Sequence, residues 1–427
     1  MTIVGVDWTT NASSPVLARI GPNGTSNVGA TNLSQHIASW PSAAPAIASA
    51  GGSAWDAFGV WGLQKRVNLW ADGTVTASFG DRCFTDTDTE NMGQCMAQLP
   101  KHLYLVDQTL ANHIRYYIAD IADVGDTIDL ADGSGTHALG ITGGFTGFGD
   151  IHPCHIRNGV VKDYVYMSAY EGYSNVTTSN LDSAANVKPT GNANMASFRT
   201  KARHRNIGAA TGWGVYDYLI HAELCMKWLV EYATFYSQGL YTGVCGVTTD
   251  GATNQAINTG YTAPLGNATG QVTVTHYQSP YPQVYPWSYR GVENLTGNIQ
   301  KLVDGVVINP TTHEVWIANN GFLTDTFTAP YVQTGLIPQI DQNGYTKVIA
   351  IDANFDWGFL SQSLGANSAM NTYLCCSGGS NHVTGTLLSA PAAITSLSQD
   401  TSIFGMSMNS TSANLYRYIG TRIMYIG

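Results

Sequence analysis

This 427-residue chain contains unusually few charged residues. Asp, Glu, Lys and Arg make up 11% of its residues, whereas about 25% is usual for a soluble domain. The polar surface must therefore come from Asn, Thr, Ser, Gln and Gly. Such a surface suits shells, fibres and carbohydrate contacts, where few fixed charges need desolvating. It equally suits a secreted, β-rich protein, and composition does not separate the two.

Basic residues are the scarcer charged kind, with 19 Lys and Arg against 29 Asp and Glu and a net charge of −10. This balance argues against broad electrostatic binding of nucleic acid. The only basic run is Arg199, Lys201, Arg203 and Arg205. It falls near the end of a predicted helix, where cations complement the negative end of the helix dipole. We interpret it as a solvated helix face.

Long hydrophobic runs are also missing. Residues 1–10 have neither the basic nor the apolar part of a signal peptide. The most apolar stretch, from Tyr216 to Tyr236, is interrupted by ionisable residues such as Glu223 and Lys227. We therefore expect no membrane insertion and assembly in a cytoplasm.

Cysteine is sparse and odd in number, which argues against a disulfide framework. The seven residues are Cys83, Cys95, Cys154, Cys225, Cys245, Cys375 and Cys376. Buried free thiols are the expected state. The adjacent pair Cys375-Cys376 is the sharpest enzymatic lead, but neighbouring cysteines do not easily place two thiolates around one substrate. Apolar packing is the favoured interpretation of the pair.

Three regions follow one another along the chain. Residues 1–53 are rich in Ala, Ser, Asn, Pro and Gly and are predicted to form an attachment arm with a linker, although the VLARIG segment suits a strand. Residues 54–165 contain short β-strands, and residues 166–427 add two helices to a loop-rich β region. The predicted class is α+β.

Turn signals divide the strands. Asp72-Gly73 and Asn158-Gly159 each predict a hairpin turn, and Asp304-Gly305 predicts a turn between two further strands. The segments VVINPTTHEVWIA and TKVIAI and the C-terminal RYIGTRIMYIG also have β character.

Two helices are predicted from capping residues and apolar spacing. Asn194 caps the first, which ends by Gly208; Asp217 caps the second, which ends near Gly239. The second helix carries an apolar stripe with a spacing of three or four residues. Its other face repeats charge every fourth residue, at Glu223, Lys227 and Glu231.

Neither metal nor cofactor is expected. His152, Cys154 and His155 have ligand chemistry, but their spacing around Pro153 matches no common zinc pattern, so packing at a strand end is favoured. Five aspartates recur every third residue at Asp120, Asp123, Asp126, Asp129 and Asp132. The EF-hand pattern and its closing Glu are absent, so solvated turns are favoured over a calcium loop. No Ser-His-Asp constellation or phosphate-binding loop is recognisable, and we expect no enzyme activity.

An aromatic cluster interleaved with proline precedes the last third of the chain. Its members are Tyr277, Tyr281, Tyr285, Trp287 and Tyr289. The rings suit a stacking platform for a glycan or peptide, or the anchoring of a loop onto the helices; the second interpretation is favoured.

The order of several motifs resembles one known family. They are WDAFGVWGLQKRVNLWADGTVTASFGD, HPCHIRNGVVKDYVYMSAYEGY, the helix-pair segment containing GWGVYDYLIHAELCMKWLVEY, GNATG, SYRGVENLTGNIQKLVDG and the terminal GTRIMYI. Together they resemble the C-type-lectin-like domains, related in fold to formylglycine-generating enzymes, that end many bacteriophage tail-fibre and virion-surface proteins. The resemblance covers about 370 residues, and it implies a C-type-lectin-like domain over 166–427 with two helices packed on a small irregular sheet. Residues 373–416 lack the tryptophans and the Gly-Gly-Ser-Trp pattern usual in the family, and the calcium-dependent sugar motifs of animal lectins are absent.

The resemblance also implies functional and structural residues. Its signature positions here are Trp213, Trp228, Glu231, Tyr289, Arg290, Glu293, Asn294, Gly297, Asn298, Asp304 and Gly305. The receptor-binding candidates on the loop face are Tyr373, Asn381, His382, Asn409, Asn414, Tyr416, Tyr281 and Tyr285.

The expected function is that of a tail-fibre or receptor-binding adhesin on the virion. It would bind a host cell-surface receptor or glycan non-covalently, contact other virion proteins through its N-terminal arm and form a homo-oligomer, with a trimer favoured. A capsid decoration or head-fibre protein is the alternative, and a formylglycine-generating-like oxidase is a remote one.

Overall fold

The structure is a computed structural model of residues 1–427. It describes residues 3–10, 16–21, 54–87, 89–141, 150–208, 211–235, 237, 240–241, 243, 256–275, 283–309, 311–320, 324–337, 344–350, 355–365, 373–375, 383–388, 403–404, 406–407, 415 and 419–427. Short strands predominate, and the fold is mixed and strand-rich, which confirms the predicted α+β class at this level.

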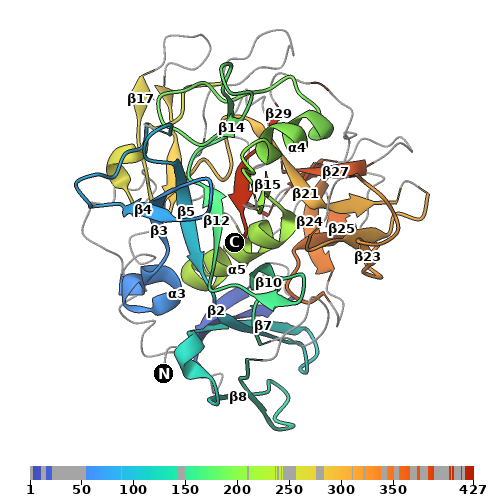
Figure 1. Ribbon diagram of the computed structural model, residues 1–427. Coiled ribbons are helices and arrows are strands. Elements are labelled where there is room, and N and C mark those ends of the chain that lie inside the picture. Colours follow the sequence, from blue (N-terminus) through green and yellow to red (C-terminus); the bar gives the residue numbers. More distant parts are fainter. Residues whose placement is uncertain are drawn as a thin grey trace.

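One helix, α5 (Tyr218–Tyr232), lies near the middle of the molecule, as Figure 1 shows. The Asp217 carboxylate caps it by accepting a hydrogen bond from the Ile220 backbone N–H at 3.0 Å, as predicted. The helix ends at Ala233, whose φ is +49°, earlier than the predicted end near Gly239. All fifteen of its residues are buried, because α5 contacts β1, β7, β21 and η3. The interpretation of its charged residues as an outer face is therefore wrong.

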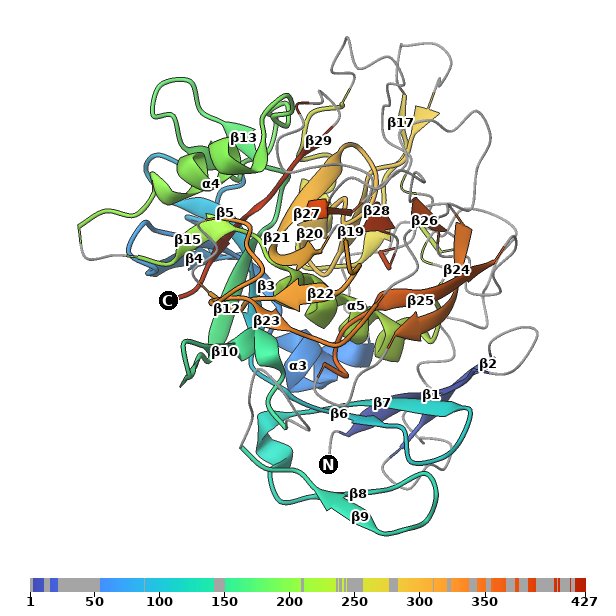
Figure 2. The ribbon, with the colours of Figure 1, turned by 90° about the vertical axis from the view of Figure 1, so that its right-hand side faces the viewer.

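A four-stranded antiparallel sheet packs against α5, and Figure 2 shows it below the helix. Its strands, in order, are β2 (Val16–Ile20), β1 (Val4–Thr9), β7 (His113–Ala119) and β6 (Leu103–Asp107). The strand predicted from VLARIG is confirmed as β2. Trp8 on β1 is buried and meets Phe235 edge-on, with 5.1 Å between ring centroids. Residues 4–9 and 16–20 thus belong to the folded core and not to a separate arm; residues 22–53 lie outside the described residues.

A six-stranded sheet joins the predicted β-rich region to the predicted C-terminal domain. Its order is β15 (Trp213–Val215), β30 (Ile423–Tyr425), β12 (Tyr164–Ser168), β5 (Gln94–Pro100), β3 (Lys65–Leu69) and β4 (Val75–Ser78). β12 pairs with β5 on one side and with the C-terminal β30 on the other. The sheet therefore crosses the boundary placed at residue 165. The predicted Asp72-Gly73 turn connects β3 and β4, with Gly73 at φ +89°.

The largest sheet has nine strands. Its order is β23 (Val332–Gln333), β22 (Val315–Ile317), β21 (Gln300–Ile308), β27 (Val383–Leu388), β28 (Met406–Ser407), β26 (Tyr373–Cys375), β24 (Gly344–Ala350) and β25 (Leu360–Gly365), with β29 (Ile419–Gly420) parallel to β21. The β character expected of VVINPTTHEVWIA is confirmed, because the segment forms an antiparallel hairpin of β21 and β22. The turn expected at Asp304-Gly305 is wrong, because β21 continues through it. Gly305, at φ +74°, instead lies where the register with β27 shifts between Val303 and Val307.

Short elements complete the fold. The strand pairs are β8 (Thr127–Asp129) with β9 (Thr136–Ala138), β10 (Ile156–Arg157) with β11 (Val160–Val161), β13 (Tyr173–Ser174) with β14 (Leu181–Asp182), and β17 (Val274–Thr275) with β18 (Gln283–Val284). A three-stranded sheet contains β16 (Gly270–Gln271), β19 (Trp287–Tyr289) and β20 (Val292–Glu293). The short helices are η1 (Ala54–Ala57), α3 (Gly59–Gly62), η2 (Ile121–Asp123), η3 (Pro153–His155) and η5 (Ala263–Leu265). Asn158 and Gly159, both at positive φ, form the predicted turn between β10 and β11.

The first predicted helix is α4 (Met195–Arg203), and Asn194 caps it as expected by accepting from the Ser197 N–H at 2.9 Å. The solvated-face interpretation of its basic run is wrong for two residues. Arg199 is buried against Asp304, with Nη2 2.6 Å from Oδ1, and Arg205 is buried against Asp182. The sequence spacing did not reveal these acidic partners, because they come from β21 and β14.

No helix among the described residues is long and apolar enough to cross a membrane.

Candidate functional site

The receptor-binding candidates fall largely outside the described part of the chain. This applies to Tyr281, Asn381, His382, Asn409, Asn414 and Tyr416. Tyr373 is on β26, where only the backbone is described. Tyr285 is half-buried beside β18. Their role in binding therefore stays a prediction.

The signature residues, in contrast, form buried structure around α5. The guanidinium of Arg290 holds both carboxylate oxygens of Glu231, with Nε 2.8 Å from Oε2 and Nη2 2.6 Å from Oε1. Tyr289 Oη donates to the same Oε2 at 3.0 Å. Burial alone would lower the pKa of Arg290, but the adjacent Glu231 carboxylate outweighs it and raises that pKa. The pair fixes the loop after β19 onto the helix.

The loop after Arg290 is fixed by hydrogen bonds that replace regular secondary structure. Asn294, at φ +51°, donates its backbone N–H to Trp287 O at 2.7 Å and accepts from Trp287 N at 3.2 Å. Glu293 accepts from the backbone N–H groups of Gly260 and Thr262. Asn298 Oδ1 accepts from Ile257 N at 2.9 Å. These side chains hold the loop in one conformation.

The other signature residues are equally internal. Trp213 packs on Tyr425 with 5.1 Å between centroids, and Trp228 stacks on Tyr232 at 4.3 Å. The carbonyl of Gly297 accepts from Lys301 Nζ. Of the remaining two, Asp304 forms the ion pair with Arg199, and Gly305 lies at the register shift in β21. These positions build a scaffold and offer no exposed contact surface.

Two members of the aromatic cluster pack inside the molecule. Trp287 and Tyr289 meet Trp228 edge-on, with centroids 5.6 and 5.3 Å apart. The anchoring interpretation is confirmed for these two rings. Tyr277 and Tyr281 lie outside the described residues.

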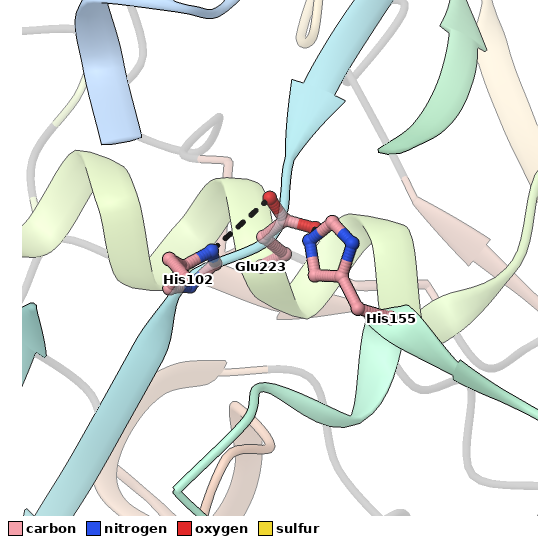
Figure 3. Close-up of side chains that lie close together, drawn as sticks. All are labelled: His102, His155 and Glu223. Atoms are coloured by element: carbon pink, nitrogen blue, oxygen red, sulfur yellow. Dashed lines mark ion pairs between the residues drawn. The ribbon is translucent and has the colours of Figure 1, made fainter. Parts of the chain in front are cut away.

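A second buried group, here called the Glu223 cluster, has no counterpart in the signature. Its members are His102, His152, Cys154, His155, Glu223 and Lys227. His102 lies between β5 and β6, His152 caps η3, and Glu223 is near the middle of α5. Figure 3 shows His102 and His155 on opposite sides of the Glu223 carboxylate. Three separate segments thus converge on one carboxylate.

The distances within the cluster are close but longer than good hydrogen bonds. His155 Nε2 lies 3.3 Å from Glu223 Oε2, and His102 Nδ1 lies 3.7 Å from Oε1. Lys227 Nζ is also 3.7 Å from Oε1. Both Glu223 oxygens, both His155 ring nitrogens and Lys227 Nζ have no hydrogen-bond partner. Unpartnered buried polar atoms on this scale are unusual and require an explanation.

Burial dominates the electrostatics of the histidines. It lowers the pKa of His102 to about 3 and holds that of His152 well below its usual range. Burial alone would raise the pKa of Glu223, but attraction to His155, Lys227 and His102 prevails and holds it well below normal. Burial lowers the pKa of Lys227 to about 8 despite the neighbouring Glu223. The cluster therefore contains a carboxylate and neutral imidazoles of His102 and His152 at neutral pH.

Sequence reasoning found half of this cluster. It noted His152, Cys154 and His155, which lie in and beside η3, directly before the start of β10, as the strand-end interpretation expected. It missed His102, some fifty residues earlier, and assigned Glu223 to an outer helix face. The only available signal was that Glu223 and Lys227 interrupt an otherwise apolar helix.

The adjacent cysteines and the aspartate series were the other candidates for enzymatic or metal chemistry, and the described residues form no such site around them. Cys375 is on β26 with its side chain undescribed, and Cys376 lies outside the described residues. Of the aspartate series, Asp120 caps η2 and Asp132 accepts from the Ser134 N–H, as turn residues do.

Comparison with protein-family models and with curated proteins gave no match.

Proposed function

We propose that this chain is a bacteriophage virion-surface protein, a tail-fibre or receptor-binding adhesin that displays a C-type-lectin-like domain. The observation that carries the proposal is the convergence of the resembling motifs. Motifs that are far apart in the sequence contact one another, and several of these contacts use signature residues such as Glu231, Arg290 and Asn298.

Three contacts illustrate this convergence. Glu231 of the helix-pair motif binds Arg290 of the SYRGVENLTGN motif. Glu171 of the YEGY motif binds Asn298 and, at 2.7 Å, Lys301.

The C-terminal motif joins the same assembly. The Arg422 guanidinium donates to the carbonyls of Ser168, Glu293 and Asn294. The convergence supports a shared fold, and the adhesin role follows from what the resembling proteins do.

The mode of binding follows from the low charge. Contacts through Asn, Ser, Thr and aromatic side chains are individually weak, so a homo-oligomer with many copies on one particle supplies avidity. Because residues 4–9 and 16–20 form core strands, attachment to other virion proteins is assigned to the undescribed stretch 22–53 or to the outer face of the fold.

Gold-labelled antibody raised against the full chain, viewed by electron microscopy on virus particles of the source, tests the proposal. Label at the tail tip or fibres supports host attachment, and label over the head would make capsid decoration the function. Particles without label would overturn the virion assignment.

Cell binding gives a sharper test once the host is known. Purified chain should compete with phage adsorption, and Asn381→Ala combined with His382→Ala should weaken the competition. Val176→Ser is the matched control, because Val176 is 88% exposed in the β13–β14 turn, away from the candidate residues in sequence. Equal competition by both variants would contradict the assigned binding residues.

A further inference from the structure

We propose that His102, His155 and Glu223 bind a divalent transition-metal ion, most consistent with Zn²⁺, in the interior of the fold. Imidazole nitrogen and carboxylate oxygen are established zinc ligands. The site uses none of the residues assigned to receptor binding, so it adds a structural metal to the proposed function.

Geometry is the first support. The three candidate ligand atoms all lie within 4.8 Å of one another. Zinc–ligand bonds of about 2.1 Å require neighbouring ligand atoms to be about 3.4 Å apart in a tetrahedral site. The 3.3 Å from His155 Nε2 to Glu223 Oε2 already meets that spacing. His102 Nδ1 lies 3.7 Å from the other carboxylate oxygen, Oε1, so the two imidazoles flank the carboxylate.

The second line of support is that several buried polar atoms of the cluster have no hydrogen-bond partner. Both oxygens of Glu223 and both ring nitrogens of His155 lack hydrogen-bond partners, although each side chain is fully buried. A buried carboxylate without hydrogen bonds costs several kcal/mol. A cation between Glu223 and the imidazoles satisfies the carboxylate and one nitrogen of the His155 ring, since a metal accepts the lone pairs that have no donor here.

The neighbouring group supports the choice of ligands. His152, Cys154 and Glu223 form a second set of the same compactness. However, His152 Nδ1 accepts from the Cys154 backbone N–H at 3.2 Å, so the proton of a neutral ring is on Nε2. Arg157 Nη2 donates to the Cys154 thiol at 3.8 Å. These atoms are already engaged, whereas those of His155 are not. His102 Nδ1 has only a long contact of 3.4 Å to the Pro100 carbonyl oxygen, and a metal at Nδ1 would replace that contact and leave the ring proton on Nε2.

The competing explanation is that Lys227 alone is the counter-ion of Glu223. Its Nζ is 3.7 Å from Oε1 and makes no hydrogen bond to it. The two explanations differ for Lys227→Met. This substitution removes a positive charge near the metal and should tighten metal binding against a competing chelator. If Lys227 is the sole counter-ion, the variant should be destabilised and bind no metal.

The experiment uses the full chain purified without a polyhistidine tag from zinc-supplemented medium, with metal content measured by mass spectrometry. We expect about one zinc per chain, a lower unfolding midpoint after chelation, recovery with Zn²⁺, and a tetrahedral d–d absorption with Co²⁺. His155→Asn and His102→Gln should lose the metal. His221→Gln should keep the metal. His221 is also a buried histidine and lies on α5 with Glu223, but it contacts Cys225 and not the Glu223 carboxylate.

Failure would be recognisable even if the variants fold poorly, because the first measurements use the natural sequence. Wild-type protein that holds no zinc and gives no Co²⁺ spectrum overturns the proposal. Loss of metal in Cys154→Ser together with retention in His102→Gln overturns this ligand assignment. None of these outcomes depends on virion localisation, so the metal site and the proposed function fail separately.

Discussion

The ion pair between Glu231 and Arg290 offers the most direct test of the scaffold. In Glu231→Gln the shape is kept but the charge that neutralises Arg290 is removed. Glu231 receives three hydrogen bonds, of 2.6, 2.8 and 3.0 Å, from Arg290 and Tyr289. The side chains of Glu231 and Arg290 are 2% and 4% exposed, so in the variant water does not reach the Arg290 guanidinium to solvate its charge.

The magnitude follows from what remains around Arg290. Removing one partner of a buried pair costs about 3–5 kcal/mol, because the other charge stays buried. Arg290 retains Asp56, with Nη1 2.7 Å from Oδ1, but the Asp56 side chain is 43% exposed. That contact is worth about 0–1 kcal/mol, so it offsets little. We expect Glu231→Gln to lower the free energy of unfolding by about 3 kcal/mol or more.

Guanidinium denaturation followed by tryptophan fluorescence measures the change. Asp56→Asn is the matched control, since it removes the exposed partner of the same guanidinium and should cost about 1 kcal/mol or less. The double variant Glu231→Gln with Arg290→Met should be more stable than the sum of the two single changes implies. If Glu231→Gln costs no more than Asp56→Asn, the buried pair does not hold the loop on α5.

Two further perturbations test burial and backbone geometry. Burial lowers the pKa of His221 from 6.5 to about 3. Below pH 6.5 the unfolded chain binds a proton that the folded chain does not, so the free energy of unfolding falls as the pH falls. At pH 5 this residue lowers the free energy of unfolding by about 2 kcal/mol. Urea midpoints at pH 7.5 and 5.0 should therefore differ less in His221→Gln than in wild type, and an equal difference would contradict a neutral buried ring. Gly212→Ala should destabilise more than Gly208→Ala, because a Cβ at Gly212 would lie 2.3 Å from the Ile426 carbonyl oxygen, whereas Gly208 is at φ +61° with open space around it. The control should cost about 1–2 kcal/mol, and similar unfolding temperatures for both variants would refute the close approach of the chain to β30.

The sequence alone determined the local structure where short-range physics dominates. Asn194 and Asp217 mark the helix starts because their side chains cap backbone N–H groups two or three residues away. Asp72-Gly73 and Asn158-Gly159 mark turns because their conformation is set within the turn itself. The α+β class followed from such signals.

Only the tertiary structure decided which polar residues face inward. Glu223 and Arg199 have the spacing of a solvated helix surface, yet both are buried against partners from distant segments of the chain. The turn signal at Asp304-Gly305 failed for the same reason, because pairing of β21 with strands on both sides favours a continuous, bulged strand. His102 and Glu223 are 121 positions apart by number, and their side chains meet only because β5, β6 and α5 pack in one core. Contacts of this range depend on chain closure over many residues, and no local pattern in the sequence encodes them.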